Sequence, residues 1–139
     1  MQYITGIHAL NLDCALETCG DWHMSALKWE NITIRESNDM FFKDYGIEQG
    51  HTIPNHSGTY AVANHIRALL DLLELGNFAV AQGMNKDFIC NPAYDNEIME
   101  KIYSMRTLPN WKEIDSFTGK EYRMKWLKFK EGKNEKLAD

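Results

Sequence analysis

Residues 6–23 read GIHALNLDCALETCGDWH and hold the densest group of reactive side chains in the chain. This stretch contains two of the five histidines, two of the three cysteines and the first tryptophan. It overlaps residues 2–10, in which the alternation of side chains predicts a largely buried strand. Asp13 is a suitable N-cap for one or two helical turns, which Gly20 would end. We expect this stretch to organise the fold by turning the opening strand back onto a sheet.

The rest of the first half has the features of strands. Residues 25–29 and 32–36 would form two strands joined at Asn31, a residue that tolerates the backbone conformation of a tight turn. Residues 60–75 then carry the clearest helical periodicity in the chain, because their apolar positions recur on one face. We expect Ser57 or Thr59 to cap this helix and Gly76 to end it.

Shorter helices are expected in the second half. One follows Asn77, one opens at Asn91-Pro92, one begins at Pro109, and one follows the capping-box pattern of Thr118–Glu121. The order of elements predicts an α+β fold, with a small, mostly antiparallel N-terminal sheet packed against a C-terminal cluster of four to five helices. We expect a single domain over residues 1–130 and a frayed polar tail over residues 131–139.

The charge of the chain is unevenly distributed. The formal net charge is −5, which disfavours broad binding to nucleic acid. Residues 1–56 contain eight acidic side chains and three basic ones, whereas residues 112–139 contain eight basic ones. We therefore expect an acidic front and a basic end.

The cysteine count and the apolar runs bear on the compartment. Three cysteines are an odd number and do not make a disulfide framework, and the first residues lack the pattern of a signal peptide. No apolar run reaches the length of a membrane-spanning helix. We expect a cytoplasmic protein with reduced thiols and no membrane association.

Cys14, Cys19 and His23 have side chains that zinc prefers, within ten residues. Structural zinc sites usually have a closer cysteine pair and four clear ligands, so we favour packing as small buried side chains. We expect no metal and no cofactor.

Asp21 and His23 would lie on the same face of a strand, with Trp22 on the other. With His8 nearby, they could act as acid and base on a nucleotide or a phosphodiester. The alternative is that Asp21 caps a turn and Trp22 belongs to the core. Because the chain has no phosphate-binding glycine motif and no nucleophile elbow, the interpretation leans away from an enzyme.

Candidate binding residues lie at both ends of the chain. Trp22 and His65 could contact a partner, although a buried, hydrogen-bonded histidine is the commoner case. Lys125, Lys128 and Trp126 form the basic face of the last helix, which could meet an acidic partner. The simpler interpretation, which we favour, is that these lysines complement the helix dipole and keep the helix soluble.

Five segments carry a resemblance that spans almost the whole chain. They are ITGIHALNL (4–12), TCGDWH (18–23), FKDYGI (42–47), VANHIR (62–67) and WKE (111–113). The chain resembles small uncharacterised bacterial proteins from mobile elements and toxin–antitoxin-like operons. The resemblance implies no catalytic residue. It favours a non-enzymatic inhibitor or antitoxin-like protein whose partner is a toxin or a defence effector.

Overall fold

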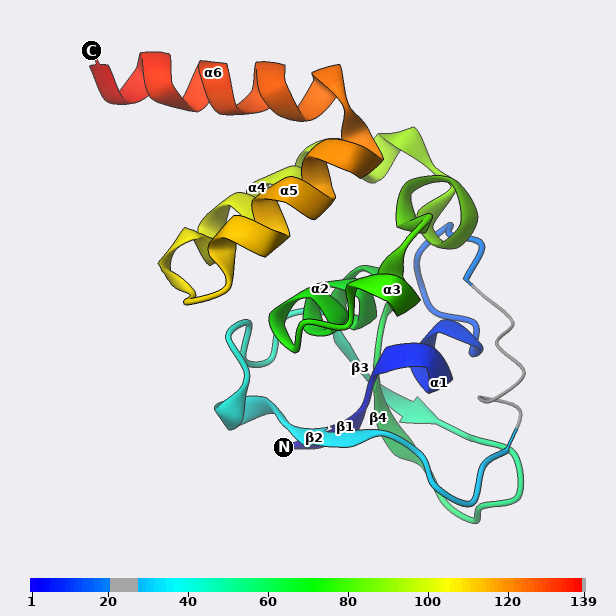
Figure 1. The fold of residues 1–139 in the computed structure, drawn as a ribbon. Helices are drawn as coiled ribbons and strands as arrows, with labels where there is room; N and C mark the ends of the chain where they lie inside the picture. The colour runs from blue at the N-terminus through cyan, green and yellow to red at the C-terminus, as the bar shows by residue number, and fades with distance from the viewer. Residues whose placement is uncertain (21–27, 139) are drawn as a thin grey trace.

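The structure, a computed structural model, describes residues 1–20 and 28–138 (Figure 1). The strands are β1 (Gln2–Ile4), β2 (Ile34–Glu36), β3 (Ile47–His51) and β4 (Tyr60–Ala63). The α-helices are α1 (Gly6–Leu10), α2 (His65–Glu74), α3 (Phe78–Ala81), α4 (Asp95–Ser104), α5 (Trp111–Tyr122) and α6 (Met124–Ala138). Shorter helical turns are η2 (Ser37–Asp39), η3 (Met84–Ile89), η4 (Pro92–Tyr94) and η5 (Met105–Thr107).

The four described strands form one sheet in the order β2-β1-β4-β3. β1 pairs with β2 and β3 pairs with β4 in antiparallel fashion, whereas β1 and β4 run parallel. The predicted α+β class is confirmed, but the sheet is mixed. The parallel pair arises because β1 and β4 each lead almost directly into a helix, and α1 and α2 pack against each other.

The molecule is arranged in successive layers (Figure 1). The sheet lies at one end, α1, α2 and α3 lie beside it, α4 and α5 follow, and α6 crosses the far end. Apolar side chains of α2 and α4 fill the space between the layers, and the four expected apolar residues of α4 are all buried: Ile98, Met99, Ile102 and Met105. No helix in the described part of the chain has the length and apolar character to cross a membrane.

The opening strand is shorter than predicted. It ends at Ile4, and the chain turns at Gly6, whose φ of 67° favours glycine, into α1. The helix predicted over residues 60–75 also begins later, because residues 60–63 form β4. The Asn64 side chain accepts a hydrogen bond from Arg67 N (2.8 Å) and so caps α2, in place of Ser57 or Thr59.

Two further local predictions are wrong. Residues 13–20 form no helical turns and are instead tied to distant segments, as in the hydrogen bond from Ala15 N to Glu48 Oε2 (2.8 Å). Thr118 lies inside α5, where its hydroxyl donates to the Ile114 carbonyl oxygen (2.8 Å), so Thr118–Glu121 is not a capping box. The helix after it starts at Met124 and continues to Ala138.

A buried network of polar side chains fixes α2 to the sheet. Arg67 Nε donates to Asp71 Oδ1 (2.8 Å), while the hydroxyls of Tyr3 and Thr5 donate to Asp71 Oδ2 (2.6 and 2.7 Å). Arg67 Nη2 donates to the Tyr3 hydroxyl (2.9 Å). Since β1 supplies Tyr3 and the residue that follows β1 is Thr5, this network joins strand and helix across the core.

Candidate functional site

His65 is the first residue of α2 and is buried, with 2% of its surface exposed. Its Nε2 lies 2.7 Å from the Leu12 carbonyl oxygen, and its Nδ1 lies 2.6 Å from Thr18 Oγ1. Gly20 closes over the ring so tightly that a Cβ there would lie 2.9 Å from His65 Cε1. Both ring nitrogens are therefore engaged inside the protein, away from any external partner.

Cys14 joins this pair to form a hydrogen-bonded chain. A carbonyl oxygen only accepts, so His65 Nε2 carries a proton and, in the neutral ring, Nδ1 accepts from the Thr18 hydroxyl. Thr18 Oγ1 in turn lies 3.6 Å from Cys14 Sγ, where it can accept the thiol proton. Thr18 thus links the half-buried thiol to the imidazole, and moving its proton converts one charge state into the other.

The electrostatics of the cluster favour the charged pair. Burial raises the pKa of the Cys14 thiol, but hydrogen bonding with His65 and Thr18 outweighs it, and the pKa lies below its ordinary value. Burial lowers the pKa of His65, but hydrogen bonding with Cys14 and the Leu12 carbonyl raises it above its ordinary value. This arrangement increases the thiolate fraction of Cys14, which is the nucleophilic form of cysteine.

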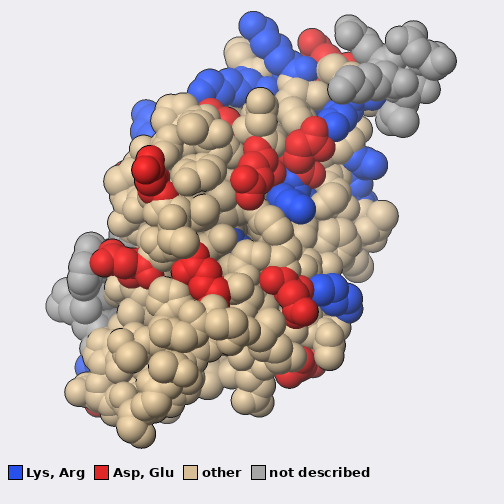
Figure 2. All heavy atoms as spheres, turned by 180° about the vertical axis from the view of Figure 1, so that it is seen from behind, with Lys and Arg blue, Asp and Glu red and all other residues tan. Residues whose placement is uncertain are grey.

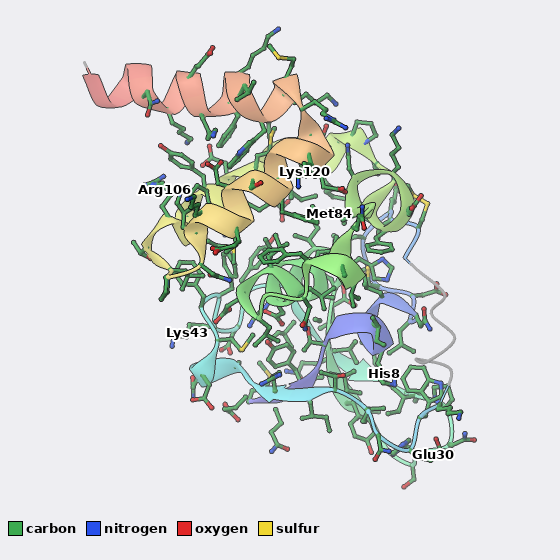
Figure 3. The ribbon with its side chains drawn as sticks, in the orientation of Figure 1. His8, Glu30, Lys43, Met84, Arg106 and Lys120 are labelled. Atoms are coloured by element: carbon green, nitrogen blue, oxygen red, sulfur yellow. A yellow bond between two sulfur atoms is a disulfide. The ribbon has the colours of Figure 1, made fainter. Side chains whose placement is uncertain are left out.

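Cys19 forms a disulfide with Cys90, which lies 71 residues further along the chain (Figure 3). Beside it, Gly20 N donates to the Phe88 carbonyl oxygen (2.7 Å), so the bridge fastens the N-terminal segment to the end of η3. The prediction that all thiols are reduced is wrong for this pair. The spacing of the cysteines gave no sign of the pairing, because the partners come from segments that only the tertiary fold brings together.

The disulfide also removes one of the three candidate zinc ligands. Cys19 has no thiolate to offer while it is bonded to Cys90, and His23 lies outside the described residues. Within residues 1–20 and 28–138, no three potential ligand side chains gather in a geometry that could hold a metal.

The predicted catalytic trio can be placed only in part. Asp21, Trp22 and His23 lie outside the described residues. His8 lies on α1 rather than on a strand, and it is buried (Figure 3). Its Nε2 donates to the Lys28 carbonyl oxygen (3.0 Å), and its ring lies 5.1 Å from that of Trp29. The joint action of His8, Asp21 and His23 stays a prediction.

Trp126 of α6 is a core residue, with 1% of its surface exposed. Its indole nitrogen donates to Asp115 Oδ1 (2.8 Å), and its ring stacks on Phe129 at 5.7 Å. Lys125 Nζ contacts Asp95 Oδ2 (2.8 Å), whereas Lys128 is exposed. Lys and Arg gather toward the end of the molecule where α6 lies, and Asp and Glu lie mostly across its middle (Figure 2).

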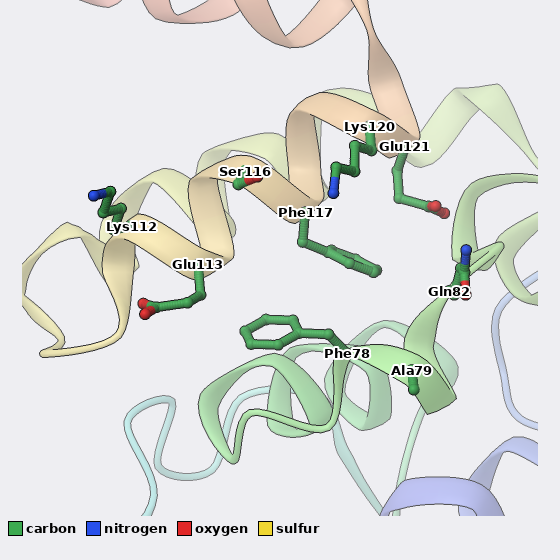
Figure 4. Close-up of a pocket in the computed structure, with 9 residues that line it drawn as sticks. All are labelled: Phe78, Ala79, Gln82, Lys112, Glu113, Ser116, Phe117, Lys120 and Glu121. Atoms are coloured by element: carbon green, nitrogen blue, oxygen red, sulfur yellow. The ribbon is translucent and has the colours of Figure 1, made fainter.

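An open groove of about 550 Å³ lies between α3 and α5 (Figure 4). Its floor is aromatic, because Phe78 of α3 and Phe117 of α5 face each other with ring centroids 5.6 Å apart. Phe117 is buried and Phe78 is half-buried. The groove is lined by Phe78, Ala79, Gln82, Lys112, Glu113, Ser116, Phe117, Lys120 and Glu121. The sequence contained one signal for it, a short apolar helix after Gly76 with no obvious cover.

The rim of the groove carries charges that are free to meet another molecule. Within the described residues, Lys112, Glu113 and Lys120 form no ion pair and no side-chain hydrogen bond that holds them in the protein. Glu121 differs, since its carboxylate accepts from Gly83 N (3.2 Å) and Asn85 N (3.3 Å). The groove therefore combines an apolar floor with three uncommitted charges.

Comparison of the chain with protein-family models, with curated proteins and with solved structures finds no match. The functional argument rests on the geometry of the sites.

Proposed function

We propose that this protein is a non-enzymatic binding protein that holds a protein partner in the groove between α3 and α5. The observation that carries the proposal is the aromatic floor formed by Phe78 and Phe117 beneath a charged rim. Protein interfaces are typically anchored by a few apolar side chains seated in such pockets and surrounded by polar groups. A volume of about 550 Å³ accommodates one large side chain together with part of its backbone.

The kind of partner follows from the resemblance of the sequence. Small bacterial proteins of mobile elements and toxin–antitoxin-like operons suggest an inhibitor or antitoxin-like protein, and we propose a toxin or a defence effector as its partner. A net charge of −5 favours a protein over nucleic acid. The predicted cytoplasmic location is less well supported, because the Cys19–Cys90 disulfide is of a kind that is rare in that compartment.

The proposal is tested by coexpressing the protein with the products of the genes beside its own. A stable complex of fixed stoichiometry is expected for the natural protein. Ser116→Arg places a long charged side chain at the exposed rim of the groove and should abolish the complex. The matched control is Ser57→Arg, which makes the same change at an exposed loop position between β3 and β4 and should leave the complex intact. A complex that survives Ser116→Arg, or the absence of any complex, would contradict the proposal.

A further inference from the structure

The charged rim of the groove follows one face of α5. Glu113, Phe117 and Lys120 occupy positions i, i+4 and i+7, which lie in line along a helix. Figure 4 shows Glu113 toward one end of the groove and Lys120 toward the other, with the Phe117 ring between them. The groove therefore has a negative end, an apolar centre and a positive end.

The charge at each end is available to an occupant. Lys120 is exposed and has no acidic partner in the described chain, and its acidic neighbour Glu121 is already held by the main chain of η3. Glu113 is likewise exposed and has no basic partner. An occupant that placed an acidic group near Glu113 or a basic group near Lys120 would meet like charge, which disfavours that orientation.

The spacing of the two charges sets the spacing on the occupant. Seven residues of α-helix separate Glu113 from Lys120, or about 10 Å along the axis at 1.5 Å per residue. An extended peptide covers that distance in about three residues, at roughly 3.3 Å each. An apolar side chain between two opposite charges on such a segment would point to the floor between Phe78 and Phe117.

We infer that the groove binds an extended protein segment with one aromatic or large aliphatic side chain between an acidic and a basic residue about three positions apart. The apolar side chain contacts Phe78 and Phe117, the acidic side chain pairs with Lys120, and the basic side chain pairs with Glu113. This inference rests on the proposed function, because it assigns the chemistry of the partner segment at the same groove.

Three small probes separate the parts of this inference. N-acetylphenylalanine carries a ring and a carboxylate, phenylalaninamide carries a ring and an ammonium group, and N-acetylphenylalaninamide carries a ring alone. Each is titrated into the ¹⁵N-labelled protein, and the dissociation constant is taken from the backbone amide shifts of Ala79, Gln82 and Ser116. We expect each charged probe to bind about two- to fivefold more tightly than the neutral one, as befits exposed ion pairs.

Variants of the rim assign each preference to its residue. Lys120→Met should remove the advantage of the carboxylate probe and leave that of the ammonium probe, and Glu113→Gln should do the reverse. Lys128→Met, a matched change at an exposed lysine outside the groove, should alter neither. Phe78→Ala should weaken all three probes.

The outcomes distinguish this inference from the proposed function. Charge preferences that disappear in the two rim variants support the inference. If the three probes bind the groove equally well, the assigned charges are wrong while the groove remains a binding site. If no probe shifts the groove amides, the inference is overturned and the proposed function loses its site as well.

Discussion

Arg67 is the buried charge on which the packing of α2 against the sheet depends. The side-chain exposures of Arg67 and Asp71 are 0% and 1%, and their Nε–Oδ1 distance is 2.8 Å. Arg67 Nη1 also donates to the carbonyl oxygens of Lys43 and Tyr45, both at 2.6 Å. We predict that Arg67→Met, which keeps an unbranched side chain but removes the guanidinium group, strongly destabilises the fold.

The expected loss follows from the groups that the substitution leaves behind. Asp71 would keep the Tyr3 and Thr5 hydroxyls as donors but would remain a buried carboxylate without its cation. Removing one partner of a buried ion pair costs about 3–5 kcal/mol. The two carbonyl oxygens of Lys43 and Tyr45 also lose their donor, which places the expected loss toward the upper end of that range.

Urea unfolding monitored by tryptophan fluorescence measures the effect. Arg67→Met should lower the free energy of unfolding by about 4 kcal/mol at neutral pH. The double variant Arg67→Met/Asp71→Leu removes both charges, and its loss should be smaller than the sum of the single losses by at least about 1 kcal/mol. A loss below about 1 kcal/mol for Arg67→Met, or strictly additive losses, would refute the role assigned to the pair.

Three further predictions concern other parts of the molecule. The alkylation rate of Cys14 should titrate at a pH below that of an ordinary thiol, because its pKa is lowered, and Thr18→Val should move this titration to higher pH; an unchanged profile would show that the hydroxyl does not link thiol and imidazole. Cys90→Ser should lower the free energy of unfolding by about 2–4 kcal/mol in thermal or urea unfolding, since the lost bridge closes a loop with a sequence separation of 71, and equal stability under oxidising conditions would argue against the bridge. Gly46→Ala should cost about 2–4 kcal/mol in the same assay, because φ is 71° and the new Cβ would lie 2.8 Å from Arg67 Cβ; a loss under about 0.5 kcal/mol would show that the loop yields freely.

The sequence predicted apolar faces better than it predicted where elements begin. Ile66 and Leu69 were assigned to the buried face of one helix, and both are buried in α2. Val62 was assigned to the same helix but belongs to β4, because an apolar residue four positions before Ile66 fits either pattern. The decisive feature is local: Asn64 caps the helix with its side chain, and this separates a four-residue strand from the helix after it.

The opening stretch shows the same limit. Residues 2–10 alternate plausibly for a strand, but Gly6 allows a backbone turn that alternation cannot reveal. The strand therefore ends at Ile4, and His8 sits on a helix with its ring against Trp29.

The candidate site was predicted as separate residues and not as a constellation. Cys14 and His65 were each noticed in the sequence, but Thr18, which joins them, lies 47 residues from His65 in the chain. The two walls of the groove, α3 and α5, are likewise separated by α4, so no local pattern places Phe78 opposite Phe117. Such long-range contacts depend on how the layers pack, which hydrophobic periodicity does not specify.

Site-specific photocrosslinking tests the central claim most directly, because it reports on the groove in the intact complex. A photoreactive phenylalanine analogue at Ala79, an exposed residue of the groove, should yield one discrete adduct with the coexpressed partner. The same analogue at Ser57, in the loop between β3 and β4, should yield none. Adding Ser116→Arg to the Ala79 protein should abolish the adduct. An adduct from Ser57 but not from Ala79 would contradict the assignment of the groove as the partner-binding site.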